Sequence, residues 1–404
     1  MPRPSKSLME VDGARVRLHF HPGQWRAWES SKRMVLVLSG TQSGKTVFGP
    51  AWLYREILRR GPGDYLVATP TFPLLALKAL PEFLHLFKRT MRLGEYVGSP
   101  TRCFKFSNQG AERTFGHVPE VETKVFFGTA SQPDSLESAT VKAAWLDEAG
   151  QKKFRLGSYE AINRRLAVNQ GRELITTTIY DLGWIKQQLY DRWQEAGRDH
   201  PLIDVIRFES TENPAFPPEE FEAARQSLPK WKFDMFYRAI FTRPAGMIYD
   251  CFDNPAISAG CPHKVKRFAI PDSWKRCLGL DFGGVNTAGV FLAEHPQTKR
   301  LFAYREYKAG GRTARDHKEA LLRGEPGVPI CVGGSASEGQ WRDEFAAAGL
   351  PVHAPTVAEV EVGIGRVYGA FKRGEAAVFD DLTGLLDELG SYSRKLDERG
   401  EPLE

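Results

Sequence analysis

One short segment near the N-terminus constrains this chain more than any other. The apolar residues 35–38 lead into a loop of small residues over 39–44, which is followed by Lys45, Thr46 and an amphipathic stretch over 47–60. This order predicts a buried parallel strand, a phosphate-binding loop and a helix. The backbone N–H groups of such a loop converge on the phosphates of a nucleotide, while Lys45 reaches the outer phosphates and the Thr46 hydroxyl ligates Mg2+.

The loop departs from the usual pattern at its first position, where Ser39 stands in place of glycine with Gly40 beside it. A chance turn of small residues is the alternative interpretation. The apolar run before the loop and the helical pattern after it argue against that alternative. The predicted nucleotide-binding residues are Ser39, Gly40, Thr41, Gln42, Ser43, Gly44, Lys45 and Thr46.

A glutamine precedes the loop in the segment 20–28, which reads Phe-His-Pro-Gly-Gln-Trp-Arg-Ala-Trp. The amide of Gln24 offers one donor and one acceptor, which is the pair that an adenine edge requires. The alternative is a helix N-terminus at which Gln24 is merely exposed. With the phosphate loop directly behind it, we expect Gln24 to contact adenine and the nucleotide to be ATP.

Two adjacent acids form the second chemical element. Asp147 and Glu148 follow Lys142 and the small and apolar residues 143–146. Ligands of open α/β sheets bind at the carboxyl ends of the strands, so these acids are predicted to lie beside the phosphate loop. Asp147 is expected to hold Mg2+ through water, and Glu148 to polarise the water that attacks the γ-phosphate. A solvated acidic strand end is the alternative for this motif taken alone.

A hydroxyl-rich run follows at Thr176, Thr177 and Thr178. Hydroxyls at the end of a strand can sense the γ-phosphate, although an ordinary threonine-rich strand has the same composition. Arg164 and Arg165 precede this run. Either could supply positive charge to the phosphate transition state, or both could be surface residues, and the sequence does not choose between these alternatives.

Composition bounds the remaining possibilities. A length of 404 residues suggests two or three domains, and 42% hydrophobic with 26% charged residues is ordinary for a soluble globular protein. No apolar run approaches the roughly 20 residues of a membrane span, so we expect a cytoplasmic protein. The five cysteines and nine histidines form no metal-binding pattern, and reduced thiols are expected. The net charge of +5 suits nucleic acid without establishing it.

A second pair of acids lies in the C-terminal half. Asp281 ends the apolar run 277–280, an apolar run over 288–292 follows, and Glu306 lies in a third run over 300–307. Strands paired as hairpins can bring Asp281 and Glu306 close together. Two hard cations roughly 3.5 to 4 Å apart need shared carboxylates of this kind to hydrolyse a phosphodiester. Asp281 and Glu306 are therefore predicted to ligate Mg2+ or Mn2+, as in RNase H-like nucleases, although a hairpin with two acids is a weak signal by itself.

Taken in order, these elements resemble the large terminase subunit of tailed bacteriophages, the motor and nuclease that packages viral DNA. The resemblance covers nearly the whole chain. It matches the adenine motif at Gln24, the Walker A loop at 39–46, the Walker B strand at 145–148, the coupling motif at 176–178, the linker at Asn213 and Pro214, and the first nuclease acid at Asp281.

The resemblance implies an α/β fold with a mostly parallel P-loop NTPase domain of the ASCE or RecA-like type over 1–210. A linker or subdomain over 211–268 and an RNase H-like (RuvC-like) nuclease domain over 269–404 would follow. It also implies that Mg2+-dependent ATP hydrolysis drives double-stranded DNA into the procapsid, and that the nuclease cuts concatemeric DNA. The implied partners are the portal protein, the small terminase subunit and further copies in a ring, in the host cytoplasm and without a membrane.

The chain departs from the family at several positions. Gly334 stands where a second catalytic Asp is expected, and the tract that carries the last acidic ligand is expected to be absent after 385–392, which would truncate and impair the nuclease. Thr41, Gln42 and Glu137 lie where the family often carries arginine, so the activating arginine is unassigned. The alternatives are a helicase-like ATPase of repair or recombination, and a portal-docking structural component that has lost its catalysis.

Overall fold

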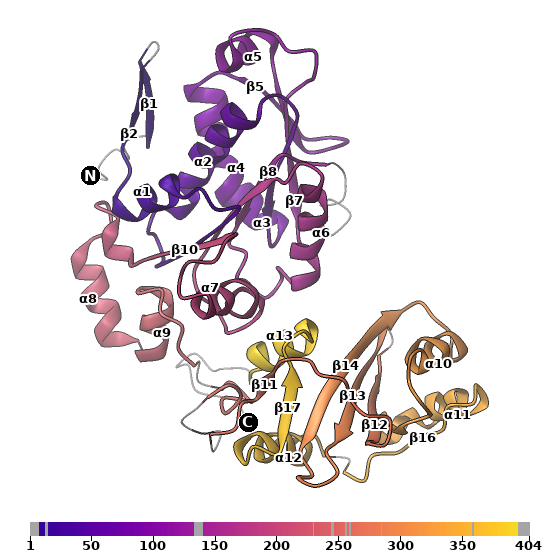
Figure 1. The fold of residues 1–404 in the computed structure, drawn as a ribbon. Coiled ribbons are helices and arrows are strands. Elements are labelled where there is room, and N and C mark those ends of the chain that lie inside the picture. Colours follow the sequence, from indigo (N-terminus) through magenta and orange to yellow (C-terminus); the bar gives the residue numbers. More distant parts are fainter. Residues whose placement is uncertain are drawn as a thin grey trace. The chain divides into compact units, whose positions relative to one another are not determined.

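The structure is a computed structural model. It describes residues 8–12, 15–132, 140–228, 230–243, 246–254, 257, 260–283, 285–357 and 359–394. The chain divides into two compact units, Met1–Ala245 and Gly246–Glu404, and each is described by itself (Figure 1). This division falls inside the stretch 211–268 that the sequence sets apart as a linker or subdomain. Among the described helices there is none with the length and apolarity that a membrane span requires.

The first unit is built on an eight-stranded sheet in the order β10-β3-β9-β8-β4-β7-β6-β5. Its strands are β3 Met34–Ser39, β4 Asp64–Thr69, β5 Gly94–Val97, β6 Cys103–Phe106, β7 Lys124–Thr129, β8 Ala143–Asp147, β9 Arg172–Thr177 and β10 Ile203–Phe208. The strands from β10 to β7 pair in parallel, and β6 and β5 add an antiparallel edge. Outside this sheet, β1 Met9–Asp12 pairs with β2 Arg15–Leu18. The predicted mostly parallel sheet is confirmed.

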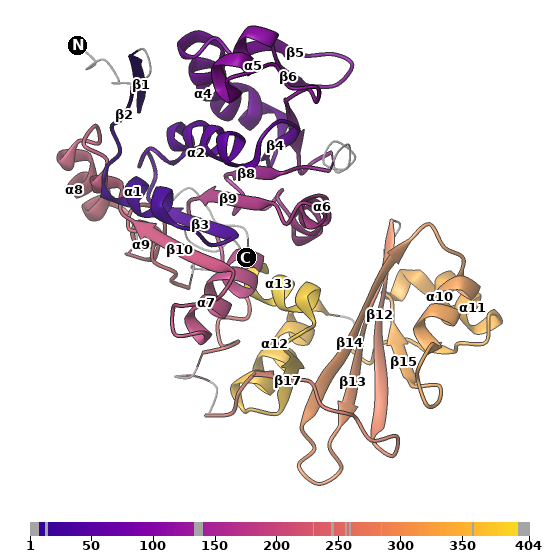
Figure 2. The ribbon, with the colours of Figure 1, turned by 45° about the horizontal axis from the view of Figure 1, so that its top comes forward.

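Helices cover both faces of this sheet (Figure 2). The α-helices of this unit are α1 Pro22–Glu29, α2 Lys45–Arg60, α3 Phe72–Leu74, α4 Leu80–Leu84, α5 Asn108–Phe115, α6 Leu156–Ala167, α7 Asp191–Glu195, α8 Pro218–Ser227 and α9 Lys230–Phe236. Because side chains alternate along a strand, Val35 and Val37 of β3 share one core with Trp52 of α2. Leu36 of β3 lies in the other core with Ile162 of α6. This burial on both faces explains why the central strands are continuous apolar runs.

The strand order fixes the class of this unit. β9 lies between β3, which leads into the predicted phosphate loop, and β8, which ends in the predicted acids. An additional strand in this place is the arrangement expected of an ASCE-type P-loop NTPase. Because β3, β8 and β9 are parallel, Gly40, Glu148 and Thr178 follow their strands at the same edge of the sheet.

The second unit contains a seven-stranded sheet in the order β11-β17-β14-β13-β12-β15-β16. Its strands are β11 Lys264–Val265, β12 Lys275–Phe282, β13 Asn286–Glu294, β14 Leu301–Gly310, β15 Ile330–Gly333, β16 Val352–His353 and β17 Ala376–Phe379. Its helices are α10 Ala314–Leu322, α11 Gly339–Ala347, α12 Val360–Lys372 and α13 Thr383–Ser391. In Figure 1, α10 and α11 lie toward the β12 end of the sheet, and α12 and α13 lie beside β17. The antiparallel β12-β13-β14 meander confirms the predicted hairpins and, flanked by parallel strands, gives an RNase H-like sheet.

Candidate active site

Two glycines shape the loop between β3 and α2. Gly44, with φ of 87°, adopts the left-handed conformation that favours glycine, directly before the first residue of α2. A Cβ atom on Gly40 would lie 2.3 Å from the Oγ atom of Ser210 and from the carbonyl oxygen of Tyr237. At the base of the loop, the Ser43 hydroxyl donates to the Ser39 hydroxyl at 2.8 Å. The Ser39 hydroxyl therefore links the start of the loop to Ser43. The absence of a side chain at Gly40 lets Ser210 and Tyr237 pack against the loop.

The backbone N–H groups of the loop fall into two sets. Those of Gly40 and Thr41 donate to the carbonyl oxygens of Phe208 at 3.1 Å and Phe236 at 2.7 Å. Those of residues 42–44 make no hydrogen bond within the part of the chain that the structure describes. Because the first turn of α2 also has free N–H groups, these donors together form a site for an anion such as phosphate. The open part of the predicted loop therefore begins at residue 42.

Gln24 lies in α1 and contacts this loop. Its Nε2 atom donates to the carbonyl oxygen of Gly44 at 3.0 Å, and its Oε1 atom accepts the backbone N–H of His21 at 3.2 Å. The His21 ring hydrogen-bonds the carbonyl oxygen of Ser43 at 3.0 Å. Both ends of the Gln24 amide are thus engaged with the protein, where they hold the loop. The predicted contact with adenine stays a prediction and requires these bonds to be exchanged.

The two acids at the end of β8 face the loop. The Thr46 hydroxyl donates to the two carboxylate oxygens of Asp147 at 3.1 and 3.3 Å. The Nζ atom of Lys45 lies 3.3 Å from Oε1 of Glu148, and each of these two side chains is 6% exposed. The structure therefore brings together Lys45, Thr46, Asp147 and Glu148, which the sequence singled out for catalysis and for metal binding in this unit.

These positions also suit a divalent cation electrostatically. Burial, followed by the neighbouring charge of Glu148, raises the pKa of Asp147 to about 7, against a hydrogen bond from Thr176 and the charge of Lys45. A cation beside Thr46 and Asp147 would favour the ionised carboxylate. Hydroxyl and carboxylate oxygens are ligands that Mg2+ accepts. The residues present therefore fit the predicted metal.

The hydroxyls at the end of β9 lie between the loop and the acids. The Thr176 hydroxyl donates to Oδ1 of Asp147 at 2.7 Å. The Nζ atom of Lys45 donates to the Thr178 hydroxyl at 3.0 Å. One strand end thus contacts a residue of the loop and an acid of β8, and its role in sensing the nucleotide stays a prediction.

The structure places the two candidate arginines away from this site. Arg164 and Arg165 lie in the last turn of α6, and the carbonyl oxygen of Arg165 accepts the N–H of Val141, just before β8 begins. The acids come at the other end of β8, which with five residues spans about 17 Å. Neither arginine can therefore serve the site of its own chain. Glu137, at another position where the family carries arginine, lies outside the described residues.

Sequence reasoning missed two further contacts of the site. The Tyr180 hydroxyl donates to Oε2 of Glu148 at 3.0 Å. Asn213, which the resemblance assigned to a linker, donates from Nδ2 to the carbonyl oxygen of Gln42 at 2.7 Å. The only available signal for Tyr180 was its place two residues after the hydroxyl run. No sequence signal indicated the contact of Asn213, because it depends on how the tertiary fold brings this later segment next to Gln42.

In the second unit, Asp281 and Glu306 lie on the same face of the sheet but apart. The strand register sets Asp281 of β12 level with Lys308 of β14, two residues beyond Glu306. Because β13 runs between β12 and β14, the two strands are about 10 Å apart. The structure therefore does not bring these two predicted metal ligands together.

The environments of the two acids differ as well. The carboxylate of Glu306 accepts the N–H groups of Gly384 at 3.0 Å and Leu385 at 2.6 Å, at the N-terminus of α13. Asp281 is exposed, and its side chain makes no ion pair or hydrogen bond within the described residues. Across that same part of the chain, no three His, Cys, Asp or Glu side chains gather to hold a metal. The described residues therefore do not fit a two-metal centre.

Gly334 follows β15, where the resemblance leads us to expect an acid. Its φ is 74°, and a Cβ atom there would lie 2.8 Å from the Phe282 ring and 2.9 Å from a guanidinium nitrogen of Arg342. That guanidinium donates to the carbonyl oxygens of Gly333 at 3.3 Å and Ser335 at 2.8 Å. The cationic side chain of Arg342 thus lies beside Gly334, where the resemblance leads us to expect an acidic metal ligand.

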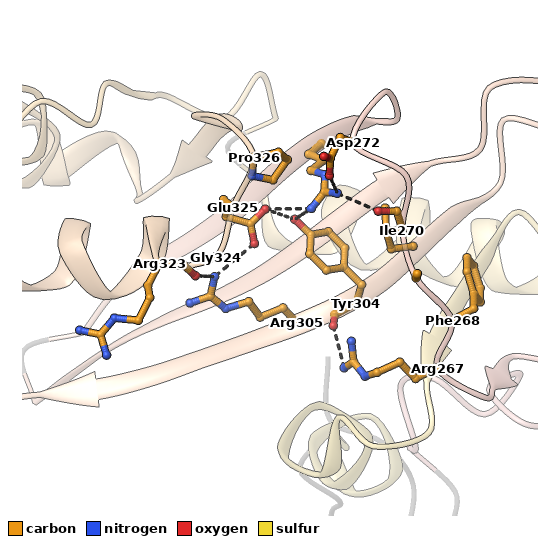
Figure 3. A pocket seen from close by; sticks show the side chains of 12 residues that line it. Arg267, Phe268, Ile270, Asp272, Tyr304, Arg305, Arg323, Gly324, Glu325 and Pro326 are labelled. Carbon is orange, nitrogen blue, oxygen red and sulfur yellow. Dashed lines mark hydrogen bonds and ion pairs between the residues drawn. The ribbon is translucent and has the colours of Figure 1, made fainter.

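The second unit also has a cavity of about 820 Å³ near the start of β12 (Figure 3). Its lining includes Arg267, Arg276, Arg305 and Arg323. The Glu325 carboxylate lies 3.1 Å from both Arg276 and Arg305, and it accepts the Tyr304 hydroxyl at 2.7 Å. Arg305 also donates to the last carbonyl oxygens of α10. The guanidinium groups of Arg276 and Arg305 are therefore engaged within the unit, which makes them part of its framework.

The fold and the site define a P-loop NTPase of the ASCE type joined to a unit with an RNase H-like sheet. Comparison with known proteins agrees with this class. No protein-family model matches the chain. It is 25% identical over 424 aligned residues to the large terminase subunits of Thermus phage G20c and Thermus virus P23-45, covering 96% of this chain and 83% of each relative.

The chain is homologous to the large terminase subunits of bacteriophages. Among solved structures, it is similar to the large terminase of a thermophilic bacteriophage, with 14% identity and a TM-score of 0.47. That match covers 95% of this chain and 94% of the solved one.

Proposed function

We propose that this chain is the ATPase of a phage DNA-packaging motor, which hydrolyses ATP with Mg2+ and moves double-stranded DNA into a procapsid. One observation carries the proposal. Lys45 and Thr46 of the phosphate loop contact Glu148 and Asp147 at the end of β8, and of these four residues only Thr46 is not buried. This set suits phosphoryl transfer, and the homology of the whole chain to large terminases directs it to DNA packaging.

Each group of the site has a task in this proposal. The N–H groups of residues 42–44 and of the first turn of α2 bind the phosphates. Lys45 moves from Glu148 to the outer phosphates, while Thr46 and Asp147 would hold the Mg2+, which neutralises phosphate charge. Once Lys45 has moved, Glu148 can accept a hydrogen bond from the attacking water and orient it.

The proposal extends to partners and place. The portal protein, the small terminase subunit and further copies of this chain in a ring are proposed from the homology to large terminases, and the site of action is the cytoplasm of the host cell. The net charge of +5 supports binding to DNA. DNA cleavage by the second unit is proposed from the same homology, but we assign no residues to it, because its described acids do not form a two-metal centre.

ATP hydrolysis stimulated by DNA tests this function. Lys45→Ala and Glu148→Gln should each lower kcat by about 100-fold or more, because each removes a group that acts on the transferred phosphate or on water. Glu195→Gln, an exposed carboxylate at the end of α7, serves as the matched control and should keep wild-type activity. Wild-type turnover in a correctly folded Glu148→Gln variant would refute the proposal.

A further inference from the structure

The carboxylate of Glu148 has two partners of different kinds. Its Oε1 atom lies 3.3 Å from the Lys45 ammonium group, and its Oε2 atom accepts the Tyr180 hydroxyl at 3.0 Å. The proposed function draws Lys45 away, because the same ammonium group must bind the phosphates. Of these two partners, only the neutral phenol can then remain in place through the reaction.

The backbone of Glu148 leaves its side chain dependent on such a partner. Glu148 has φ of 55°, in the left-handed region that residues with a Cβ atom seldom adopt. Its carbonyl oxygen accepts the N–H of Gln151 at 3.1 Å, which closes a turn directly after β8. The side chain therefore leaves from a turn and not from a strand, so its direction is not fixed by sheet pairing.

Tyr180 is itself held firmly. Its ring centroid lies 5.7 Å from that of Phe236 in α9. Nε2 of Gln151 donates to its hydroxyl oxygen at 3.4 Å, and the Thr178 side chain is a further hydrogen-bond partner. Burial raises the pKa of Tyr180, which keeps the phenol protonated and able to donate. A fixed, neutral donor is suited to orient a carboxylate without competing with the phosphates for charge.

We propose that Tyr180 is a positioning residue that keeps Glu148 aimed at the attacking water after Lys45 has moved to the nucleotide. This inference rests on the proposed function and names a residue that acts through Glu148. Because the phenol binds Oε2, the Oε1 atom that Lys45 releases becomes free to accept a hydrogen bond from water. Lys45 and Tyr180 thus both hold Glu148 before the nucleotide binds, and Tyr180 continues to hold it afterwards.

The contacts of Phe236 add a reason for the placement of Tyr180. The ring of Phe236 packs on Tyr180, and its carbonyl oxygen accepts the N–H of Thr41 in the phosphate loop at 2.7 Å. The end of α9 therefore touches both the loop that binds phosphate and the residue that positions the carboxylate. Through Phe236, the position of Tyr180 is therefore tied to that of the phosphate loop.

The variant Tyr180→Phe tests the inference, because it keeps the ring and removes only the hydroxyl. We expect kcat of DNA-stimulated ATP hydrolysis to fall about tenfold, since a misdirected carboxylate orients water poorly. KM for ATP and the Kd of a non-hydrolysable ATP analogue should change less than about twofold, because the phosphate contacts remain. Tm, measured alongside, should stay close to that of the wild type.

Tyr190→Phe is the matched control. The hydroxyl of Tyr190 accepts Nε2 of Gln194 at 2.7 Å, and its ring packs on Phe241, away from the catalytic carboxylate. Its kcat should equal that of the wild type. An unchanged kcat in Tyr180→Phe would overturn the inference alone, as would a loss of analogue binding equal to the loss of kcat. A wild-type protein without ATP hydrolysis would overturn the proposed function and this inference with it.

Discussion

Each of the two units carries a pair of acids at its sheet. The two acids lie together in the first unit and apart in the second. Asp147 and Glu148 are adjacent in the chain, so one strand and one turn deliver both to the phosphate loop. Asp281 and Glu306 come from two strands with a third between them. A site supplied by one local segment depends on few other contacts, whereas a site assembled from several strands depends on every one of them.

The two pairs of acids also differ in their hydrogen-bond and ion-pair partners. In the first unit, Asp147 accepts two hydroxyls and Glu148 meets a lysine and a phenol, which are groups that suit a reacting phosphate. In the second unit, the Glu306 carboxylate caps α13. The first pair is arranged for ligands, and the described contacts of Glu306 are structural.

The largest expected effect separates the two pairs directly. Asp147→Asn should lower DNA-stimulated ATP hydrolysis by about 100-fold, because it removes the charge of a proposed oxygen ligand of the metal. Asp281→Asn is the matched change in the second unit and should leave the ATPase rate within about twofold of the wild type. A steady-state ATPase assay over a range of Mg2+ concentrations measures both. Equal losses in the two variants would contradict the division of roles between the units.

A smaller effect tests what burial does to an acid that has no part in the proposed metal site. Glu173 lies in β9, where burial raises its pKa to about 7, against a hydrogen bond from Tyr159. As the pH rises from about 4.5 to 7, the unfolded chain loses this proton before the folded chain does, so the free energy of unfolding falls. Glu173→Gln removes that loss, and the variant should exceed the wild type by a few kcal/mol at pH 8 and much less at pH 5.

Urea unfolding of both proteins at the two pH values measures this difference. Glu195→Gln, at an exposed position, should show no such dependence on pH. A stability difference between Glu173→Gln and the wild type that is the same at pH 5 and pH 8 would show that Glu173 is ionised in the folded protein. Glu173 could then no longer show how burial raises the pKa of an acid outside the proposed metal site.

Local pattern predicted the first site well. The apolar run, the small-residue loop and Lys45 are neighbours in sequence, so a phosphate loop between a strand and a helix could be read without knowing the fold. The acids of β8 were found for the same reason, since a buried strand in a parallel sheet ends at the ligand edge. The contact of Tyr180 with Glu148 was not predicted. It depends on a turn in which Glu148 has a left-handed backbone, and no pattern in the sequence indicated that turn.

The second site shows where such pattern reasoning stops. The hairpin strands were predicted from successive apolar runs, but the expectation that they bring Asp281 and Glu306 close together was wrong, because the register sets Asp281 level with Lys308. The hydrogen bonds from α13 to the Glu306 carboxylate were not predicted, because their donors lie 78 and 79 residues further along the chain. Contacts across such separations depend on how helices dock on the sheet, which the sequence of either segment does not specify.

The smallest expected effect concerns this helix cap. Glu306→Gln keeps one acceptor for the N–H groups of Gly384 and Leu385, but it removes the negative charge at the N-terminus of α13. It should lower the free energy of unfolding by about 1 kcal/mol, the usual worth of a cap and its interaction with the helix dipole. Glu319→Gln, in the exposed Arg315 pair on α10, is the matched control and should cost less. If Glu306→Gln instead left stability unchanged and abolished Mn2+-dependent nicking of plasmid DNA, Glu306 would be a metal ligand, and the two units would use their acids alike.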